Sequence, residues 1–406
     1  MHFERGHDYR RAVQYCEQAG KNAIRRSAHR EAVAHLTRGL ELLKTLPATP
    51  ERSQQELALQ VALGAPLLAT KGYAAPEVGA AYTRARELCQ QMGETPQLFP
   101  VLMGLRFFYT VKGELQTGRE LGEQLLRLAQ SEQNPPLLLE AHYALGVPLM
   151  LLGEFAAARA HFEQSLACYD PEQYCSRAFL YGHNPVVGCL SIAAWTLWFL
   201  GYPEQAFKKD HEAITLAQEL SPASLAFALG FSAGFHHFRR DGQVGQEQAE
   251  RLIVLSREQG FSFWLARGTF QRGWALVEQG HSEEIAQIRQ GLAALQATGA
   301  EAYGTGFLAI LAEACGKIGQ AKDGLNVLAE AFALVDRIGE HFYEAELYRL
   351  KGELVLQSGV RGPESQEKKQ KSKGKSRKKL SVVSSQRPVP NVQSPIRSRS
   401  MFSQSH

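Results

Sequence analysis

The chain has 406 residues, of which 44% are hydrophobic and 21% are charged. This composition excludes a chain that is disordered throughout, because the apolar content is sufficient to build a large core. The formal charge of +4 conceals an uneven distribution. Residues 361–406 hold 12 Lys or Arg against Glu364 and Glu367, which leaves 33 basic and 39 acidic residues in the preceding body. The body is therefore mildly acidic, and the positive charge lies in the C-terminal segment, called here the basic tail.

The sequence predicts neither export nor a membrane span. The amino terminus, MHFERGHDYRR, lacks the apolar run of a signal peptide. The longest apolar segment, residues 186–202, is interrupted by Gly188, Ser191 and Gly201, and this pattern favours a buried helix. Six cysteines occur without a C-x-x-C pair, which is typical of reduced core residues in the cytoplasm. They are Cys16, Cys89, Cys168, Cys175, Cys189 and Cys315.

Glycines recur through the body at one kind of turn. Successive positions differ by 41, 40, 48, 41, 38, 39 and 40 residues, a period near 40 with one insertion. An apolar helix precedes each glycine and a second helix with small residues follows it, so each unit is predicted to be a helical hairpin. The glycines are Gly72, Gly113, Gly153, Gly201, Gly242, Gly280, Gly319 and Gly359.

Residues 141–171, AHYALGVPLMLLGEFAAARAHFEQSLACYDP, form the clearest unit. Leu145 and Gly146 lie where the neighbouring helix must approach closely, because glycine has no side chain to keep the backbones apart. Gly153 is expected to end the first helix in the left-handed conformation. Ala158 is the expected small contact on the second helix, and Phe162 is expected to fill the space between the two helices.

This spacing resembles the tetratricopeptide signature, although its period exceeds the usual 34 residues. No run of alternating residues with turn signals predicts a strand. The expected fold is all-α, a tetratricopeptide-like α-solenoid of about eight hairpins. The predicted signature positions are Gly20, Ala32, Gly113, Leu145, Gly146, Gly153, Ala158, Phe162, Gly201, Ala206, Gly280, Gly319, Ala331 and Gly352.

The longest connection between units, residues 172–188, is the expected place for a ligand, because insertions in a solenoid tend to fall on one face. Its candidate residues are Tyr181, His183 and Asn184. Cys175, His183 and Cys189 are also considered as zinc ligands, but their irregular spacing favours a packed loop, and no metal or cofactor is predicted.

Two other groups of residues are interpreted as parts of the fold and not as functional sites. His236 and His237, followed by Phe238, Arg239 and Arg240, form a dense polar cluster that is interpreted as an exposed helix end rather than a metal or anion site. Aromatic residues at helical spacing are interpreted as core. These aromatic residues are Trp195, Trp198, Phe199, Phe261, Phe263, Trp264 and Trp274.

The last unit is predicted to be incomplete. Residues 341–359, HFYEAELYRLKGELVLQSG, supply a first helix, and the basic tail follows in place of a second one. The tail is rich in Lys, Ser, Arg and Pro and is expected to be disordered. We therefore expect a repeat domain over residues 1–360 and a disordered tail over residues 361–406.

Several phrases in the body resemble a known family. ERSQQELALQVALGAPLLATKGYAAPEV, GFSFWLARGTFQRGWALVEQG and FYEAELYRLKGEL are similar to the carboxy-terminal, tetratricopeptide-like half of large bacterial predicted ATPases, which often carry a class III adenylate or guanylate cyclase domain. The resemblance covers roughly residues 3–356. It implies a helical array that senses a signal or partner for a nucleotide-driven switch.

The catalytic part of that family is not found in this sequence. A phosphate loop requires G-x-x-x-x-G-K-[ST], and the three Gly-Lys pairs, at Gly20, Gly316 and Gly374, lack the first glycine. The chain is therefore expected to be a detached or truncated piece without ATPase or cyclase activity.

The leading hypothesis is a protein-interaction or regulatory scaffold whose concave face holds a peptide or protein, including an ATPase or cyclase polypeptide. The alternative is a repeat domain that senses a small molecule for a nucleotide-switched transducer. Nucleic-acid binding would rest on the basic tail only and is disfavoured. The oligomeric state is left open.

Overall fold

The computed structural model describes residues 8–93, 95–171 and 182–359. The chain divides into two units, Met1–Ser358 and Gly359–His406. All of the described helices lie in the first unit. The boundary expected at Val360 and the disorder expected for the basic tail fall outside the described residues, and both remain predictions.

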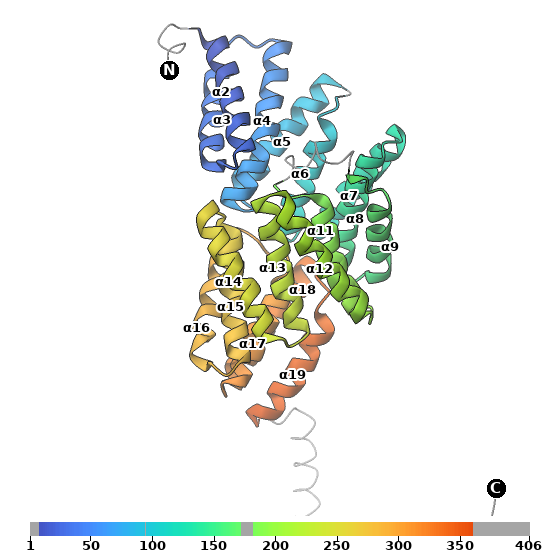
Figure 1. The fold of residues 1–406 in the computed structure, drawn as a ribbon, viewed down its shortest axis with the longest axis vertical. Helices are drawn as coiled ribbons and strands as arrows, with labels where there is room; N and C mark the ends of the chain where they lie inside the picture. Colours follow the sequence, from blue (N-terminus) through green and yellow to red (C-terminus); the bar gives the residue numbers. More distant parts are fainter. Residues whose placement is uncertain (1–7, 94, 172–181, 360–406) are drawn as a thin grey trace, which may run out of the picture. The chain divides into compact units, whose positions relative to one another are not determined.

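The described residues form an array of helices without strands, which confirms the all-α solenoid. Helices pair into eight successive hairpins, and one further helix follows them (Figure 1). The first helices of the hairpins, together with the final unpaired helix, are α2 (Tyr9–Arg25), α4 (Pro50–Lys71), α6 (Leu98–Val111), α8 (Pro135–Leu151), α11 (Pro185–Phe199), α13 (Pro222–Phe238), α15 (Ser262–Glu278), α17 (Gly304–Lys317) and α19 (Glu344–Ser358).

The second helices carry their buried residues on one stripe. In α3, for example, the buried positions Ala32, Leu36, Gly39 and Leu43 recur every three or four residues, as expected for a helix with one face against the core. A short 3₁₀-helix, Ser282–Glu284, precedes α16. The second helices are α3 (His29–Leu43), α5 (Pro76–Met92), α7 (Leu115–Glu132), α9 (Phe155–Ala167), α12 (Pro203–Leu220), α14 (Gly242–Gln259), α16 (Ile285–Ala297) and α18 (Ala321–Ile338).

The turn inside most hairpins has the same hydrogen-bonded form. At Gly153, the N–H of Gly153 donates to Met150 O at 3.0 Å and the N–H of Glu154 donates to Leu149 O at 2.9 Å. This pair of bonds is the Schellman motif, in which a residue with positive φ ends the helix. The same pair recurs at Gly113, Gly201, Gly280 and Gly319, all of which have positive φ.

Two hairpins place a different residue at that position. Ser27 (φ 55°) closes the first hairpin and Arg240 (φ 58°) closes the sixth, with the same pair of bonds. The assignment of Gly242 as a turn glycine is therefore wrong, because Gly242 is the first residue of α14. The Arg240 guanidinium pairs with Glu313 of α17 and lies 3.7 Å from Glu346 of α19, so the side chain at this turn has its own contacts.

The first helices from α6 to α17 are buried on most sides, whereas α2 and α19 bury one stripe each. In α11, every residue from 185 to 197 is buried, whereas α12 buries only Ala206, Asp210, Ala213 and Ala217. A helix that is apolar all round must be covered all round. The first helices from α6 to α17 therefore lie inside the array, and the second helices that pack on them lie outside it.

Repeats far apart in the sequence meet across the inner side of the array. The N–H groups of Glu301 and Ala302 donate to Val111 O at 2.9 and 3.1 Å, and those of His341 and Phe342 donate to Leu151 O at 3.0 and 3.1 Å. Ser262 Oγ donates to Thr70 O at 2.9 Å. These five bonds join the ends of α4, α6 and α8 to the segments that precede or begin α15, α17 and α19. We call this set of contacts the seam.

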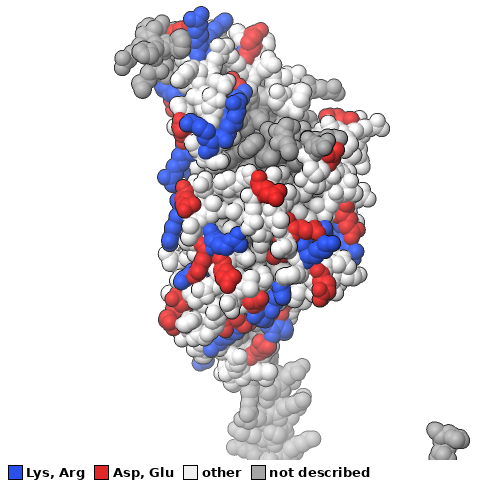
Figure 2. All heavy atoms as spheres, in the orientation of Figure 1, with Lys and Arg blue, Asp and Glu red and all other residues white. Residues whose placement is uncertain are grey.

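The outer surface carries charges of both signs. Lys and Arg are interspersed with Asp and Glu over the face shown in Figure 2. Many of the described ion pairs join residues three or four apart in the sequence, such as Arg159 with Glu163, and such exposed pairs contribute little to stability. None of the described helices is both long and apolar enough to cross a bilayer.

Candidate ligand-binding site

Several signature residues predicted from the sequence lie at contacts between helices. A Cβ atom added to Gly20 would lie 2.6 Å from Leu36 Cγ, and one added to Gly146 would lie 2.5 Å from Phe162 Cε1. Leu145 and Phe162 are buried. The small residues of the second helices have no exposed surface; they are Ala32, Ala158, Ala206 and Ala331.

Gly352 differs from the other signature positions. It is exposed on α19, and an added Cβ would meet nothing within 4 Å. No helix follows α19 as its hairpin partner within the described residues, and Gly352 makes no close approach there. Gly352 therefore does not have the contact that a repeat-signature glycine would need.

The inner faces of the first helices meet in a cluster of aromatic side chains. Tyr73 contacts Phe107 and Trp264, with ring centroids 6.0 and 6.2 Å apart, and Trp195 contacts Tyr303 at 5.7 Å. We call this cluster the aromatic interior. The structure therefore shows packed side chains where an open concave groove was expected. Its members are Tyr73, Phe107, Tyr143, His183, Trp195, Phe227, Phe231, Trp264, Tyr303 and Phe342.

Among the described residues of the predicted ligand loop, His183 belongs to this interior. His183 stacks on Phe227 with ring centroids 4.1 Å apart, and its two nitrogens contact Tyr73 Oη at 3.2 Å and Tyr143 Oη at 3.0 Å. Burial lowers the pKa of His183 to about 3, so the ring is neutral. Asn184 instead caps α11 by accepting from the N–H groups of Val186 and Val187.

The remaining loop candidates do not assemble into a metal site. Tyr181 and Cys175 lie outside the described residues. Cys189 Sγ is 3.6 Å from Phe162 O, and both nitrogens of His183 have tyrosine partners. No group of three His, Cys, Asp or Glu side chains in the described ranges is arranged to hold a metal ion.

Two arginines are completely enclosed by the aromatic interior. Arg106 of α6 and Arg267 of α15 are each 1% exposed, and both line a cavity of about 40 Å³ together with Thr110 and Tyr303. We call it the arginine cavity. Within the described residues neither guanidinium forms an ion pair, in contrast to Arg272 one turn further along α15, which pairs with Glu250 at 3.0 Å.

The two guanidinium groups are held by carbonyl oxygens and ring faces. Arg106 Nε donates to Ala144 O at 2.7 Å, and Arg267 Nε donates to Gly230 O at 3.1 Å. Arg267 Cζ lies 4.4 Å from the ring centroid of Phe231 and 5.4 Å from that of Tyr303. Burial lowers the pKa of Arg267 to about 10, so the group stays charged at neutral pH.

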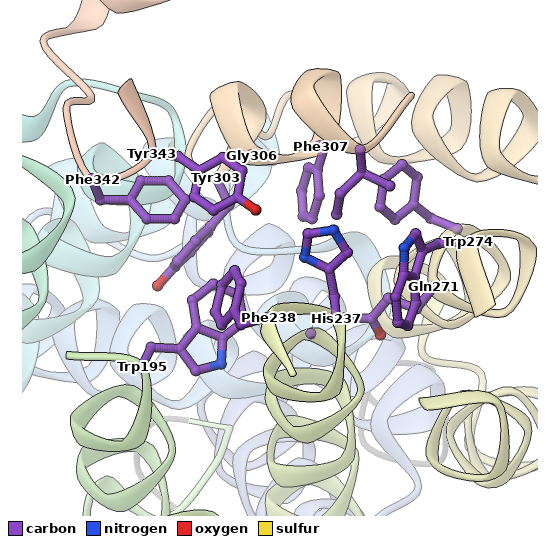
Figure 3. A pocket seen from close by; sticks show the side chains of 13 residues that line it. Trp195, His237, Phe238, Gln271, Trp274, Tyr303, Gly306, Phe307, Phe342 and Tyr343 are labelled. Carbon is purple, nitrogen blue, oxygen red and sulfur yellow. The ribbon is translucent and has the colours of Figure 1, made fainter. Parts of the chain in front are cut away.

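A second cavity of about 20 Å³ lies next to the first, and both share Tyr303 (Figure 3). We call it the histidine cavity. In Figure 3, His237 and Gln271 lie among the rings of Trp274, Phe307 and Phe342. Gln271 Nε2 donates to Gly230 O at 2.7 Å, the same carbonyl that Arg267 uses.

The interpretation of His236 and His237 as an exposed helix end is wrong. They are 4% and 3% exposed, because the end of α13 is covered by Trp274 and by Tyr343 ahead of α19. Burial lowers the pKa of both histidines. His237 Nε2 is 3.8 Å from the carboxylate of Glu313. Burial alone would raise the pKa of Glu313, but His237, Arg240 and Lys317 lower this pKa to about 2.

Unsatisfied polar atoms concentrate around the two cavities. Nine buried side-chain nitrogen or oxygen atoms in the described residues have no hydrogen-bond partner, and six belong to residues that line a cavity. Such atoms are few in natural proteins, and each needs an explanation. The six are Thr110 Oγ1 and Arg267 Nη2 in the arginine cavity, and His237 Nδ1, His237 Nε2, Gln271 Oε1 and Trp274 Nε1 in the histidine cavity.

The sequence analysis did not select Arg106 or Arg267. A signal was present, because Arg106 interrupts the otherwise apolar run LFPVLMGLRFFYTV, and Arg267 interrupts SFWLARGTF. An arginine on an inward face of a fully buried helix is rare unless it has a partner or a ligand. The aromatic residues were correctly assigned to the core, but Trp195, Trp264 and Trp274 also line the cavities.

Comparisons with known proteins show the fold of this chain but do not show its family. No family model matches the chain. An uncharacterised protein of Rhizobium meliloti strain 1021 is 24% identical over 365 residues, which is 89% of this chain and 35% of that protein. This chain thus spans about a third of the length of the curated relative it matches. The link to ATPases and cyclases is not shown by these comparisons.

Two solved structures share the architecture. The Rap conjugation gene regulator of plasmid pLS20, in complex with the Phr* peptide, has a TM-score of 0.57 and 14% identity, covering 82% of this chain and 97% of that one. A Rap protein complexed with competence and sporulation factor has a TM-score of 0.52 and 13% identity, covering 85% and 99%. At these identities the likeness shows the tetratricopeptide-like repeat fold alone.

Proposed function

We propose that this chain is a binding and regulatory module whose ligand enters the aromatic interior and whose repeat array transmits binding to a partner protein. The observation that carries the proposal is the set of six unsatisfied polar atoms around the two cavities. A buried polar group without a partner costs roughly 1–3 kcal/mol. An interior that served packing alone would gain stability by replacing these groups with apolar ones.

The position of the cavities supports a regulatory role. The arginine cavity is lined by Arg106 and Tyr143 from repeats on one side of the seam, and by Arg267 and Tyr303 from repeats on the other. A ligand that contacts both sides binds better to the closed arrangement than to one in which the seam is parted. Binding therefore shifts the balance between the two arrangements by the difference in affinity.

The proposed partner is an ATPase- or cyclase-type polypeptide. This part of the proposal is supported by the resemblance of residues 3–356 to the helical half of such proteins and by the greater length of the Rhizobium relative. The chain itself is proposed to act by binding without catalysis, because the phosphate-loop motif is not found in its sequence.

A peptide ligand is the second candidate. It belongs to the leading hypothesis from the sequence, in which the concave face holds a peptide or protein. The two Rap structures are complexes with a peptide and with a competence and sporulation factor, and their fold resembles this one. In the present arrangement, however, the interior cavities measure about 40 and 20 Å³. Spaces of this size favour a small molecule, or the end of a larger one, over an extended peptide.

The proposal is tested by asking whether the full-length protein acquires a ligand in the cell. Protein purified under gentle conditions is examined by native mass spectrometry, and small molecules are identified after denaturation. We expect a bound small molecule that is lost when Ile310, on the wall of the histidine cavity, is replaced by Phe to fill that space. Protein that carries no ligand, and whose melting temperature responds to no compound in a metabolite library, would contradict the proposal.

A further inference from the structure

The arginine cavity contains two cations that no charged group within the described residues neutralises. A guanidinium has five N–H donors. Arg106 uses donors to Ala144 O and Tyr143 O, and Arg267 uses one to Gly230 O. Seven of the ten donors therefore have no acceptor within the described residues, and Arg267 Nη2 is buried without any partner.

The surrounding rings do not replace an anion. Arg106 Cζ lies 4.9 Å from the ring centroid of Phe107 and 5.2 Å from that of Tyr143. A cation over a ring is stabilised by less than the burial of an unpaired ion costs. Two such ions at the same cavity also repel each other.

The buried carboxylate of Glu340 has other partners. Glu340, which has no exposed surface, accepts hydrogen bonds from Tyr303 N at 2.5 Å and from Thr305 N at 3.0 Å. Its second contact with Thr305 is made by the hydroxyl, also at 2.5 Å. Glu340 therefore holds the start of α17 and forms no ion pair with either arginine.

Water alone does not explain the site. A cavity of about 40 Å³ has room for water, and water would satisfy Thr110 Oγ1. A neutral water molecule does not neutralise the charge of two guanidinium groups, however. An acceptor that carries negative charge satisfies the free donors and the charge together.

From these contacts we infer that the arginine cavity binds the carboxylate of a small organic acid, held between Arg106 and Arg267, with the apolar part of the acid against the aromatic rings. This inference rests on the proposed function and names the class of its ligand. The guanidinium fork matches both carboxylates and phosphates, and a carboxylate is favoured because the cavity measures only about 40 Å³ and its other lining groups are mostly apolar.

The test compares matched charged and neutral probes on the full chain. Isothermal titration calorimetry and thermal denaturation are carried out with acetate, benzoate, benzamide and inorganic phosphate at constant ionic strength. We expect acetate or benzoate to bind and to raise the melting temperature, and benzamide and phosphate to have no effect. The peptide Gly-Gly-Phe is compared with benzoate, because a peptide end presents the same carboxylate, and the stronger response identifies the source.

Variants separate a binding role from a packing role. Arg267→Met and Arg106→Met each should weaken carboxylate binding by about tenfold or more, since each removes a charge-assisted contact. Arg272→Met, on the same helix but paired with Glu250, should leave binding unchanged. Without ligand, the melting temperature of Arg267→Met should equal or exceed that of the wild type, because an unpaired buried charge has been removed.

The outcomes are distinguishable. Undiminished carboxylate binding in both arginine variants, or binding of phosphate in place of carboxylates, would overturn the inference. If a neutral compound fills the interior and no acid does, the inference fails while the proposed function stands. If Arg267→Met does not fold, which would assign that side chain to packing, Arg106→Met decides the question through the same titrations.

Discussion

Ala158 lies in α9, which packs against α8 and α11, and its side chain has no exposed surface. Replacement by Arg would place a long charged side chain in a close helix contact, where overpacking and an unpaired charge both oppose folding. We expect Ala158→Arg to lower the free energy of unfolding by about 3 kcal/mol or more, measured by thermal or urea denaturation. Ala157→Arg is the matched control, because Ala157 is exposed and its replacement should have little effect. Equal stability of the two variants would show that the contact at Ala158 is not close.

Glu340 is expected to make stability depend on pH. Burial raises its pKa to about 7, although hydrogen bonds from Thr305 and Tyr303 oppose the shift. Because the folded state holds this proton more tightly than the unfolded state, the contribution is fully present below pH 4.5 and is lost as the pH rises through 7. Between pH 4.5 and 8, the stability of the wild type should fall by up to about 3 kcal/mol relative to Glu340→Gln.

The measurement is the unfolding free energy of both proteins across that pH range. Asp210 has a pKa that burial also raises to about 7, and it titrates in both proteins, so the difference between them isolates Glu340. Parallel pH profiles for the two proteins would show that Glu340 does not titrate in this window.

At the scale of the helices, the same substitution is expected to have opposite effects on stability at two glycines. A Cβ on Gly291 of α16 would lie 2.4 Å from the backbone nitrogen of Phe270 in α15, whereas one on Gly352 of α19 would meet nothing within 4 Å. Gly291→Ala should therefore cost about 2 kcal/mol, because the two helices must move apart. Gly352→Ala should gain up to about 1 kcal/mol, because alanine is the better helix former. Calorimetric melting of the two variants checks both signs.

The sequence predicted the helices and their pairing well, because those features depend on local patterns. The period near 40 identified the hairpins, and the L-G and A-x-x-x-F spacing selected Gly146, Ala158 and Phe162, which the structure places between helices. Gly242 was misassigned because glycine is common both at a turn and at the start of the next helix. Arg240 takes the left-handed conformation instead, and no local pattern identified it.

The interior was not predictable in the same way. Arg106 and Arg267 are 161 positions apart in the sequence, and only the seam brings their helices to one cavity. The same is true of His237, whose burial depends on Trp274 and Tyr343 from two later repeats. Periodicity shows which side of a helix faces inward, but it does not show which distant repeat faces that side.

For the molecule as a whole, we expect the basic tail to be removed first by protease. The tail sequence is poor in apolar residues and carries 12 basic side chains, which is typical of segments that do not fold. Limited proteolysis followed by mass spectrometry should yield a stable core that ends near Gly359, where α19 has already buried Leu347, Leu350 and Leu354.

Removal of the tail should also abolish salt-sensitive retention on heparin, because the remaining body is net acidic. A tail as resistant to protease as the repeats, or a core that unfolds without it, would move the domain boundary from Val360. Retention that persists after truncation would locate a basic surface on the repeats themselves.

The seam also restricts how this protein can change in length. An open solenoid contacts only its neighbouring units, so a whole repeat can be gained or lost with little disturbance elsewhere. Here Val111 O receives the N–H groups of Glu301 and Ala302, and Leu151 O receives those of His341 and Phe342. Deletion of one hairpin between these partners would shift every later segment by one position and leave each carbonyl opposite the wrong loop. The seam therefore fixes the number of repeats between its two sides. Evolutionary insertions should accumulate at the ends of the array or in loops, and not as added hairpins within it.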